Sequence, residues 1–303
     1  MIKLPNGLDP YNLIDYLRLI SWEAADILLY YSGILNDPKY KNKIIKTKSD
    51  ESPVTLADLK VNELILGRMQ EKYLSVCWNY LSEENTKLLP NKKNKNSEWL
   101  WILDPLDGTK DFIEGTDDFA MHFALNYQNK PYIGIVLIPK RDELWISNGE
   151  KVWGEKRDGS LININLSKKN NLEEMVLVRS KNHSSGTLRT LIDKIKFKNI
   201  VKMGSVGCKI SSIIRGDADI YISLSLPGKS SPKDWDFAAP EAILLTSGGA
   251  ITNLDNEDLS YNNSNFEQRG LIIASSNKHT HKDVCSQIKQ IIKDANIYEL
   301  ISN

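Results

Sequence analysis

The spacing of apolar residues changes character near residue 168, and this change limits the folds that the chain can adopt. Residues 119–165 alternate apolar runs with turn signals such as Asn148-Gly149, which predicts an antiparallel meander. Beyond residue 168, short apolar segments alternate with helix-like segments, as is typical of a layered α/β unit. We therefore expect an N-terminal α+β half with an antiparallel sheet (residues 1–168) and a C-terminal α/β half (residues 169–303).

Individual elements follow from the same patterns. Apolar residues recur at helical spacing over residues 11–33, and a second helix is expected from Thr55 to about Lys72. Strands are expected at Val76–Leu81, Trp99–Leu103, Met175–Val178, Asp219–Ile222, Ala250–Asn253 and Leu271–Ala274. Further helices are expected near residues 185–196, 208–215, 237–247 and 279–293. The Lys- and Asn-rich stretches 36–52 and 90–97 are expected to be surface loops.

The charge balance argues against a nucleic-acid-binding protein. Thirty-nine Lys and Arg residues face 39 Asp and Glu residues, so the formal net charge is zero at pH 7. A chain without a positive field and without a polybasic arm is not expected to hold nucleic acid stably.

The apolar stretches and the cysteines indicate a cytoplasmic protein. Charged residues interrupt the first helix, and no stretch reaches the roughly 20 residues that span a bilayer, so neither a signal peptide nor a membrane span is expected. Cys77, Cys208 and Cys285 are far apart and form no CxxC motif. This usage suits reduced thiols rather than a disulfide framework or a zinc site.

An acidic turn follows the apolar strand Trp99–Leu103, in the sequence Asp104-Pro105-Leu106-Asp107-Gly108-Thr109. Pro105 fixes its own φ and removes a backbone donor, and Gly108 permits a tight bend. Two carboxylates three positions apart on such a turn can converge on one point, together with the Leu106 carbonyl. Oxygen ligands of this kind suit Mg²⁺. An acidic turn that merely caps the next helix would show the same short pattern.

Three other acidic residues stand at the ends of expected elements. Glu83 follows the strand before the acidic turn, where an acid has no packing role. Asp58 closes Thr55-Leu56-Ala57-Asp58, which as a bare pattern is a helix capping box. Asp236, after Trp235, stands at a helix start and could equally be a cap. Each is ordinary alone, but their order along the chain indicates one site. His122 lies between apolar residues and is expected to be a core histidine rather than a ligand.

These motifs resemble those of the inositol monophosphatase superfamily, whose members are Mg²⁺-dependent and typically lithium-sensitive phosphatases. The signature is Trp101-Ile102-Leu103 followed by the acidic turn, with Ser82-Glu83-Glu84 upstream and Trp235-Asp236 downstream. The resemblance covers Ser52 to about Ser275. It implies the αβαβα layered sandwich of the inositol monophosphatase and fructose-1,6-bisphosphatase fold. It also implies hydrolysis of a phosphate monoester by metal-activated water, without a covalent intermediate.

The resemblance assigns metal ligands residue by residue. It implies a first Mg²⁺ held by Glu83, Asp104 and the Leu106 carbonyl, and a second held by Asp104, Asp107 and Asp236. The chemistry is consistent with this, because crowded carboxylates repel one another and a phosphate dianion unless cations are present.

Catalytic roles are implied for three residues. Asp58, with Glu83, would lie near a third, weaker metal position. Thr109, hydrogen-bonded to Asp58, would help to orient and deprotonate the attacking water. Backbone N–H groups after Gly108, at the expected start of a helix, would hold the phosphate oxygens.

Three segments resemble the branch of 3′(2′),5′-bisphosphate nucleotidases of the CysQ type, which convert adenosine 3′,5′-bisphosphate to AMP and phosphate in sulfur assimilation and nucleotide recycling. They are residues 103–113, residues 52–58 with 81–84, and residues 204–209. The resemblance implies substrate contacts from Gly108, Thr109, Ser205, Lys209, Lys233 and Asp236. Lysine binds phosphate as a point charge, so Lys209 and Lys233 would face the second phosphate. Lys229 is at least as well explained as a solvated surface lysine.

Two main alternatives remain open at this point, and hydrolysis of a sugar bisphosphate is a lesser one. An inositol-1-phosphate phosphatase shares the signature, although such enzymes generally place a Glu shortly before the final Trp-Asp, and Tyr221-Ile222-Ser223 has none. A binding protein of the same fold that acts in RNA or transcription complexes is the second alternative. Zero net charge and retention of all five acidic positions argue against it. A monomer or a homodimer is expected, and loop 223–234 has no assigned role.

Overall fold

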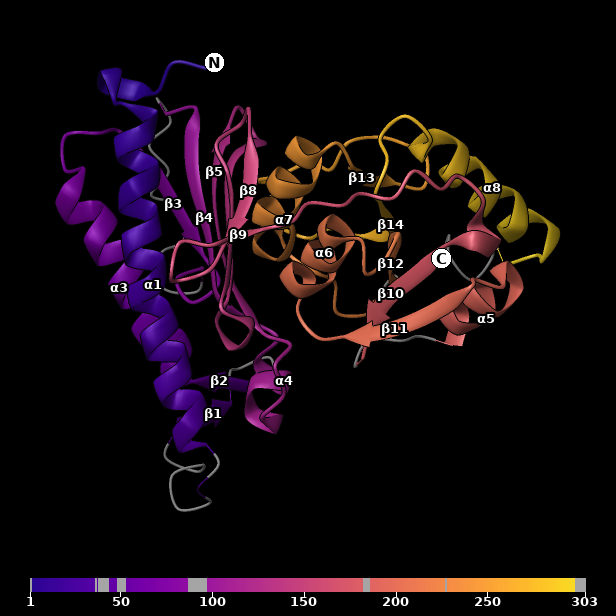
Figure 1. Cartoon of the computed structure of the whole chain (residues 1–303), viewed down its shortest axis with the longest axis horizontal. Helices are drawn as coiled ribbons and strands as arrows, with labels where there is room; N and C mark the ends of the chain where they lie inside the picture. Colours follow the sequence, from indigo (N-terminus) through magenta and orange to yellow (C-terminus); the bar gives the residue numbers. More distant parts are fainter. Residues whose placement is uncertain are drawn as a thin grey trace.

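The computed structural model describes residues 2–35, 37, 44–47, 53–86, 97–181, 186–226 and 228–297. Its two larger sheets and six of its helices lie in five layers, in the αβαβα order that the resemblance implies, whereas α4 (Thr109–Glu114) and a small two-stranded sheet lie outside them (Figure 1). From one side to the other the layers are helices α1 (Pro10–Ile34) and α3 (Leu56–Lys72), a seven-stranded sheet, helices α6 (Val206–Arg215) and α7 (Asp234–Ser247), a five-stranded sheet, and helices α5 (Gly186–Ile195) and α8 (His281–Asp294).

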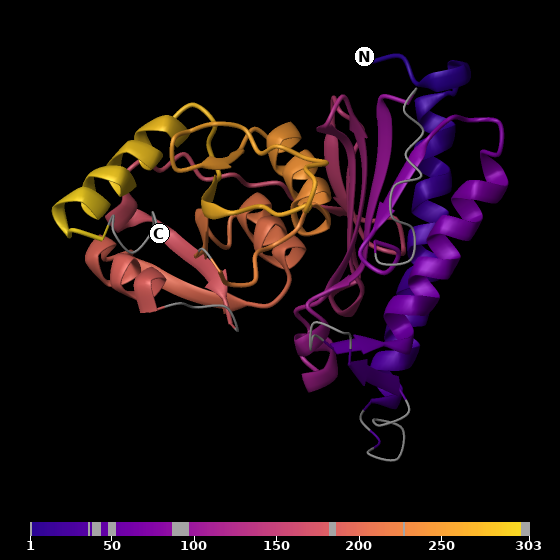
Figure 2. The ribbon, with the colours of Figure 1, turned by 180° about the vertical axis from the view of Figure 1, so that it is seen from behind.

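The strands of the large sheet are neighbours in chain order. They are β3 (Asn79–Ser82), β4 (Trp99–Asp107), β5 (Ala120–Tyr127), β6 (Lys130–Ile138), β7 (Glu143–Ser147), β8 (Val152–Glu155) and β9 (Leu161–Ile162). All pairs from β4 onward are antiparallel, which confirms the predicted meander, whereas β3 and β4 are parallel. Helices cover both faces of this sheet, as Figure 2 shows from behind, so β4 and β5 are buried along almost their whole length.

The small sheet has the order β11-β10-β12-β14-β13. Its strands are β10 (Val176–Ser180), β11 (Asn199–Met203), β12 (Ile220–Ser225), β13 (Ala250–Asn253) and β14 (Gly270–Ser275). The sequence did not predict β11, because this edge strand is largely exposed and lacks an apolar run. Within the described ranges no strand pairs across residue 168, and the division of the chain there remains a prediction.

Three apolar cores separate the layers. The first lies between the long helices and the large sheet and includes Leu17, Ile65 and Trp101, all fully buried. The second surrounds α6 and α7 between the sheets, and the third lies under α5 and α8. The middle helices are therefore fixed against both sheets, and their first turns meet the end of β4.

Other sequence predictions can be checked against the described residues. None of the helices in these ranges has both the length and the apolar character needed to cross a membrane. Cys208 and Cys285 are buried, and Cys77 is exposed. Most of the predicted loops 36–52 and 90–97 lies outside the described residues, although Ile45–Thr47 forms β1 and pairs with β2 (Pro53–Thr55).

Candidate metal centre

Strand β4 carries the acidic turn at its end. Its register against β5 shifts between Asp104 and Asp107, where Pro105 supplies no N–H for the ladder. Asp104 is 1% exposed, and its Oδ1 accepts a hydrogen bond from Leu106 N–H at 3.0 Å. The irregular strand end thus fixes this buried carboxylate through one of its two oxygens.

Three carboxylates converge here. Asp104, Asp107 and Asp236 each place an oxygen within 4.8 Å of the others. Asp236 comes from the first turn of α7, and its Oδ2 accepts a hydrogen bond from Lys233 N–H. It is therefore both a helix cap and a member of the cluster, so the two interpretations of this residue are compatible.

The crowding of these groups makes the ionisation of Asp104 and Asp236 unfavourable. Burial raises the pKa of Asp104 well above its ordinary value, and repulsion from Glu83, Asp107 and Asp236 raises it further. Burial and repulsion from Asp107 likewise raise the pKa of Asp236. A divalent cation removes such repulsion and is bound preferentially by oxygen ligands. The cluster therefore fits a metal ion such as Mg²⁺.

Asp58 provides a second indication of a cation. Its Oδ2 accepts hydrogen bonds from Thr55 N–H at 2.8 Å and from Thr55 Oγ1 at 2.6 Å, which completes a capping box at the start of α3. Its Oδ1 is buried and has no hydrogen-bond partner. Burial raises the pKa of Asp58 to about 7, and repulsion from Glu83 contributes although the Thr55 hydroxyl opposes it. A buried carboxylate oxygen without a partner is costly unless a ligand satisfies it.

Glu83 lies beside this cluster. Its backbone N–H donates to Leu103 O at 3.1 Å, which ties the turn after β3 to β4. Its carboxylate contributes to the raised pKa of Asp58, Asp104 and Asp236. Among the described residues, however, the 4.8 Å group contains only the three aspartates.

Thr109 requires a correction. The resemblance implies a hydrogen bond between Thr109 and Asp58, but the Thr109 hydroxyl donates to Leu106 O at 3.1 Å instead. A hydroxyl has one proton to donate, and Thr109 gives it to Leu106 O, while Asp58 Oδ1 has no hydrogen-bond partner. The predicted hydrogen bond is therefore wrong in this structure. The Leu106 carbonyl keeps a second lone pair for a metal ion.

The start of α6 holds Asp107 in place. Asp107 Oδ2 accepts hydrogen bonds from Ser205 Oγ at 2.7 Å and from Val206 N–H. Gly108 follows with φ +88°, and a Cβ at this position would lie 2.8 Å from Asp118 O. The bend that the sequence predicts at Gly108 is therefore confirmed, and a neighbouring backbone segment leaves no room for a larger residue.

His122 joins the two middle helices. Its Nε2 accepts a hydrogen bond from Gly207 N–H at 3.1 Å, and its Nδ1 donates to Trp235 O at 3.3 Å. The ring is 1% exposed, and burial lowers its pKa, so it is held in its neutral form. The prediction of a core histidine is confirmed. The ring also lies 3.5 Å from Asp107 Oδ2, where it helps to enclose that carboxylate.

The three lysines considered for a substrate phosphate differ in their surroundings. Lys209 is 3% exposed and donates from Nζ to Ser205 O at 3.0 Å, while its ammonium lies 5.2 Å from the centre of the Tyr221 ring. Burial lowers the pKa of Lys209, although Asp107 opposes this. Lys233 Nζ instead pairs with Glu267 at 3.0 Å, and Lys229 is exposed. The substrate contacts assigned to Ser205, Lys209 and Lys233 remain predictions.

Sequence reasoning missed the contacts that support Asp107. The anchoring groups on α6 are 98 and 99 positions away in the chain, and no local pattern links them to the acidic turn. A set of ion pairs involving Asp111, Asp118, Arg141 and Lys181 was also missed. Asp111 stands four positions after Asp107, and this proximity was the one available signal.

Fold and site together define a class of protein, in which αβαβα layers enclose a cluster of carboxylates that fits a metal ion. The family model described as the inositol monophosphatase family matches residues 15–293, so the chain belongs to the inositol monophosphatase family. This confirms the resemblance seen in the sequence.

Known relatives agree with this membership. The chain is 32% identical to the 3′(2′),5′-bisphosphate nucleotidase CysQ of Buchnera aphidicola over 228 residues, covering 75% of this chain and 80% of that protein. It is 26% identical to the protein of the same name from Escherichia coli K12 over 252 residues, covering 82% and 94%. The crystal structure of the extragenic suppressor protein suhB from Bartonella henselae superposes with a TM-score of 0.71 at 22% identity, covering 92% and 98%, which confirms the fold.

Proposed function

We propose that this protein is a 3′(2′),5′-bisphosphate nucleotidase that removes the 3′-phosphate of adenosine 3′,5′-bisphosphate to give AMP and phosphate. The observation that carries the proposal is the cluster of Asp104, Asp107 and Asp236, in which two carboxylates have strongly raised pKa values. The relatives named CysQ support the choice of substrate. A cytoplasmic location, a role in sulfur assimilation and a monomeric or dimeric state remain predictions.

Mg²⁺ is the proposed cofactor, with two ions and a third, weaker position. Glu83, Asp104 and the Leu106 carbonyl would hold one ion, and Asp104, Asp107 and Asp236 the other. When bound, the ions make a water molecule more acidic and stabilise the charge on the leaving oxygen.

The protein itself would position the attacking water. The Thr109 hydroxyl donates to Leu106 O, so its oxygen can still accept a hydrogen bond from that water. The buried, unpartnered Oδ1 of Asp58 and the nearby Glu83 are proposed as proton acceptors. No side-chain nucleophile is needed, because the water attacks phosphorus directly.

Substrate contacts are proposed at the two sides of Asp107. Backbone N–H groups of Gly108 and Thr109 would hold oxygens of the phosphate that is removed. The ammonium of Lys209 lies close enough to Asp107 for that carboxylate to raise the pKa of the lysine against the effect of burial, and it would bind the second phosphate. Lys233 would need to leave Glu267 to contribute its charge.

The function can be tested with purified protein and Mg²⁺ in a parallel assay of adenosine 3′,5′-bisphosphate, inositol 1-phosphate and fructose 1,6-bisphosphate. We expect the highest kcat/KM for the bisphosphate nucleotide. A preference for inositol 1-phosphate would instead support the inositol phosphatase. Failure to release phosphate from any of the three would favour a binding protein of the same fold.

Lys209→Met is expected to raise KM for adenosine 3′,5′-bisphosphate by roughly 10- to 100-fold, the range expected when a hydrogen bond to a charged group is lost. Methionine keeps the volume of this buried side chain. KM for adenosine 3′-monophosphate, which lacks the second phosphate, should change little. Lys229→Met serves as the control and should leave both values unchanged. Equal increases on the two nucleotides would show that Lys209 does not contact the second phosphate.

A further inference from the structure

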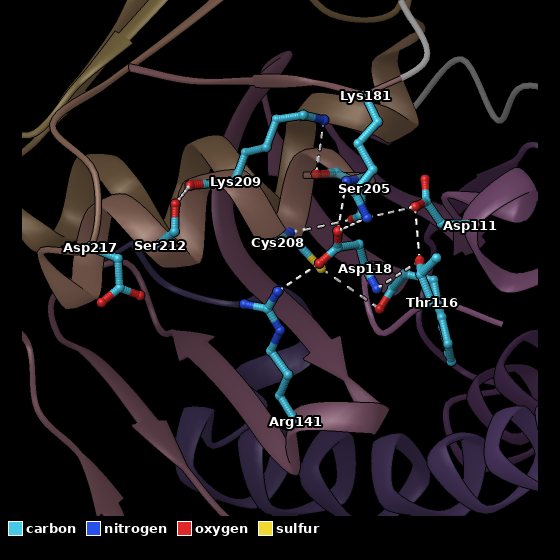
Figure 3. A network of polar contacts seen from close by, with 12 residues as sticks. Asp111, Thr116, Asp118, Arg141, Lys181, Ser205, Cys208, Lys209, Ser212 and Asp217 are labelled. Carbon is cyan, nitrogen blue, oxygen red and sulfur yellow. Dashed lines mark hydrogen bonds and ion pairs between the residues drawn. The ribbon is translucent and has the colours of Figure 1, made fainter. Parts of the chain in front are cut away.

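An ion-pair network lies close to Ser205 (Figure 3), whose hydroxyl donates to Asp107 of the proposed metal centre. Lys181, which follows β10, reaches Asp111 Oδ1 at 3.1 Å and also pairs with Asp118 Oδ2. Arg141 approaches Asp118 from the opposite side, with Nη2 at 2.6 Å from Oδ1. Thr116 Oγ1 donates to Asp111 Oδ1 at 2.8 Å. Two buried carboxylates and two cations are thus brought together.

The network is continuous with the turn that grips Asp107. Gly204 N–H donates to Asp118 Oδ2 at 3.3 Å, on the same oxygen that pairs with Lys181. The backbone N–H of Lys181 donates to Met203 O at 3.1 Å, one residue earlier. The next two residues of this turn, Ser205 and Val206, donate to Asp107 Oδ2. Lys181 therefore holds the start of the turn through both its backbone and its side chain.

The ion pairs of the network favour the charged forms of Asp118 and Lys181, which burial disfavours. Burial alone would raise the pKa of Asp118, but hydrogen bonds from Lys181 and from Gly204 N–H outweigh it and hold that pKa below its ordinary value. Burial likewise tends to lower the pKa of Lys181, but its hydrogen bonds to Asp118 and Asp111 raise it above the usual value. Removing the ammonium would leave two neighbouring carboxylates with one cation fewer, which is strongly unfavourable in a buried site.

We propose that Lys181 is a positioning residue for Asp107. Its ion pairs with Asp111 and Asp118 hold the turn from Gly204 to Val206 against the end of β4, and so fix the orientation of the Asp107 carboxylate. The network also connects the two sheets. Asp111 and Asp118 follow strand β4 of the large sheet, whereas Lys181 and Gly204 follow strands β10 and β11 of the small sheet. The inference rests on the proposed function in so far as Asp107 is a metal ligand.

The test is Lys181→Met, with the half-saturating Mg²⁺ concentration measured in two ways. One is Mg²⁺-dependent phosphate release, and the other is the rise of Tm on adding Mg²⁺ without substrate. Loss of a group that orients a metal ligand costs roughly 10- to 100-fold in metal affinity or activity, so we expect a shift of that size by both measurements. Lys181→Arg keeps the charge and should recover most of the affinity.

Lys169→Met is the matched control. Lys169 pairs with the buried Asp219 at 2.8 Å, and the two side chains are 35% and 3% exposed, compared with 30% and 2% for Lys181 and Asp111. Lys169→Met should lower Tm about as much as Lys181→Met does, without shifting the half-saturating Mg²⁺ concentration. If Lys181→Met fails to fold, Thr116→Val, which removes one hydrogen bond to Asp111, should shift the Mg²⁺ dependence in the same direction by a smaller factor.

The measurements distinguish a failure of the proposed metal centre from a failure of the role proposed for Lys181. Wild-type protein that is not stabilised by Mg²⁺ would contradict the proposed metal centre itself. If Mg²⁺ stabilises the wild-type protein but its half-saturating concentration is unchanged in both Lys181→Met and Thr116→Val, the positioning role of Lys181 is contradicted, and the proposed metal centre is not. A raised KM for substrate with unaltered Mg²⁺ dependence in Lys181→Met would identify Lys181 as a substrate contact and so overturn its assignment as a positioning residue.

Discussion

Asp104→Asn is expected to lower turnover by roughly 1,000-fold or more and yet to stabilise the metal-free protein. Asp104 is proposed to bind both Mg²⁺ ions, and loss of several kcal/mol of transition-state stabilisation accounts for the lower rate. The opposite effect on stability follows from the raised pKa of Asp104, which shows that its negative charge is unfavourable in the fold. Asparagine keeps the oxygen that accepts from Leu106 N–H but removes that charge.

The dependence on pH has a definite sign. Because the pKa of Asp104 is higher in the folded than in the unfolded chain, the folded state binds the proton more tightly. Its contribution to stability is full below the unfolded value of about 3.9 and is lost as the pH rises through the folded value. In EDTA at neutral pH, Asp104→Asn should therefore have the higher Tm, by roughly 2–4 °C for each kcal/mol regained. With Mg²⁺ present, this advantage should shrink or disappear.

Asp219→Asn is a suitable comparison for this variant. Asp219 is 2% exposed, and it is paired with Lys169 and accepts a hydrogen bond from Val176 N–H. Its charge is compensated, so the same substitution should lower Tm and leave turnover nearly unchanged. A lower Tm for Asp104→Asn than for wild type in EDTA, or substantial remaining turnover, would contradict the assignment of Asp104.

Local sequence patterns were sufficient to predict those parts of the site whose residues are neighbours in the chain. The acidic turn and the capping pattern at Thr55 and Asp58 are local, and the structure forms both where the sequence predicts them. For Asp58 the sequence offered a cap or a site residue as alternatives. The structure is compatible with both, because one carboxylate oxygen caps α3 and the other is buried without a partner.

Long-range contacts could not be predicted in this way. Ser205 is part of a segment that resembles nucleotidases, and its substrate contact remains a prediction, but no sequence pattern indicates that its hydroxyl donates to Asp107. The hydrogen bond implied between Thr109 and Asp58 is absent because the Thr109 hydroxyl donates its proton to Leu106 O on its own segment. Strand β11 was missed since edge strands need few apolar residues. Such choices depend on how the layers pack, which a single sequence does not display.

Gly204→Ala is expected to have the second large effect, by displacing the turn that holds Asp107. A Cβ at Gly204 would overlap two oxygens. Asp111 Oδ2 belongs to a side chain of the ion-pair network, and Asp118 O belongs to the backbone. Neither atom can move away freely, because Asp111 is held by Thr116 and Lys181, and Asp118 O precedes β5. Overpacking of this kind costs roughly 1–3 kcal/mol of stability.

The cost in activity should be larger than the loss of stability alone would give. A displacement of about 1 Å in a group that positions the reacting centre can lower the rate roughly 100-fold, and Ser205 and Val206 would move together with residue 204. Gly67→Ala is the control, since Gly67 lies in α3 and a Cβ there has no atom within 4 Å. Alanine at that exposed helical position should stabilise the protein by roughly 0.5–1 kcal/mol and leave kcat unchanged. If Gly204→Ala retained wild-type kcat at a temperature where it is folded, the close contact at this turn would not be required to orient Asp107.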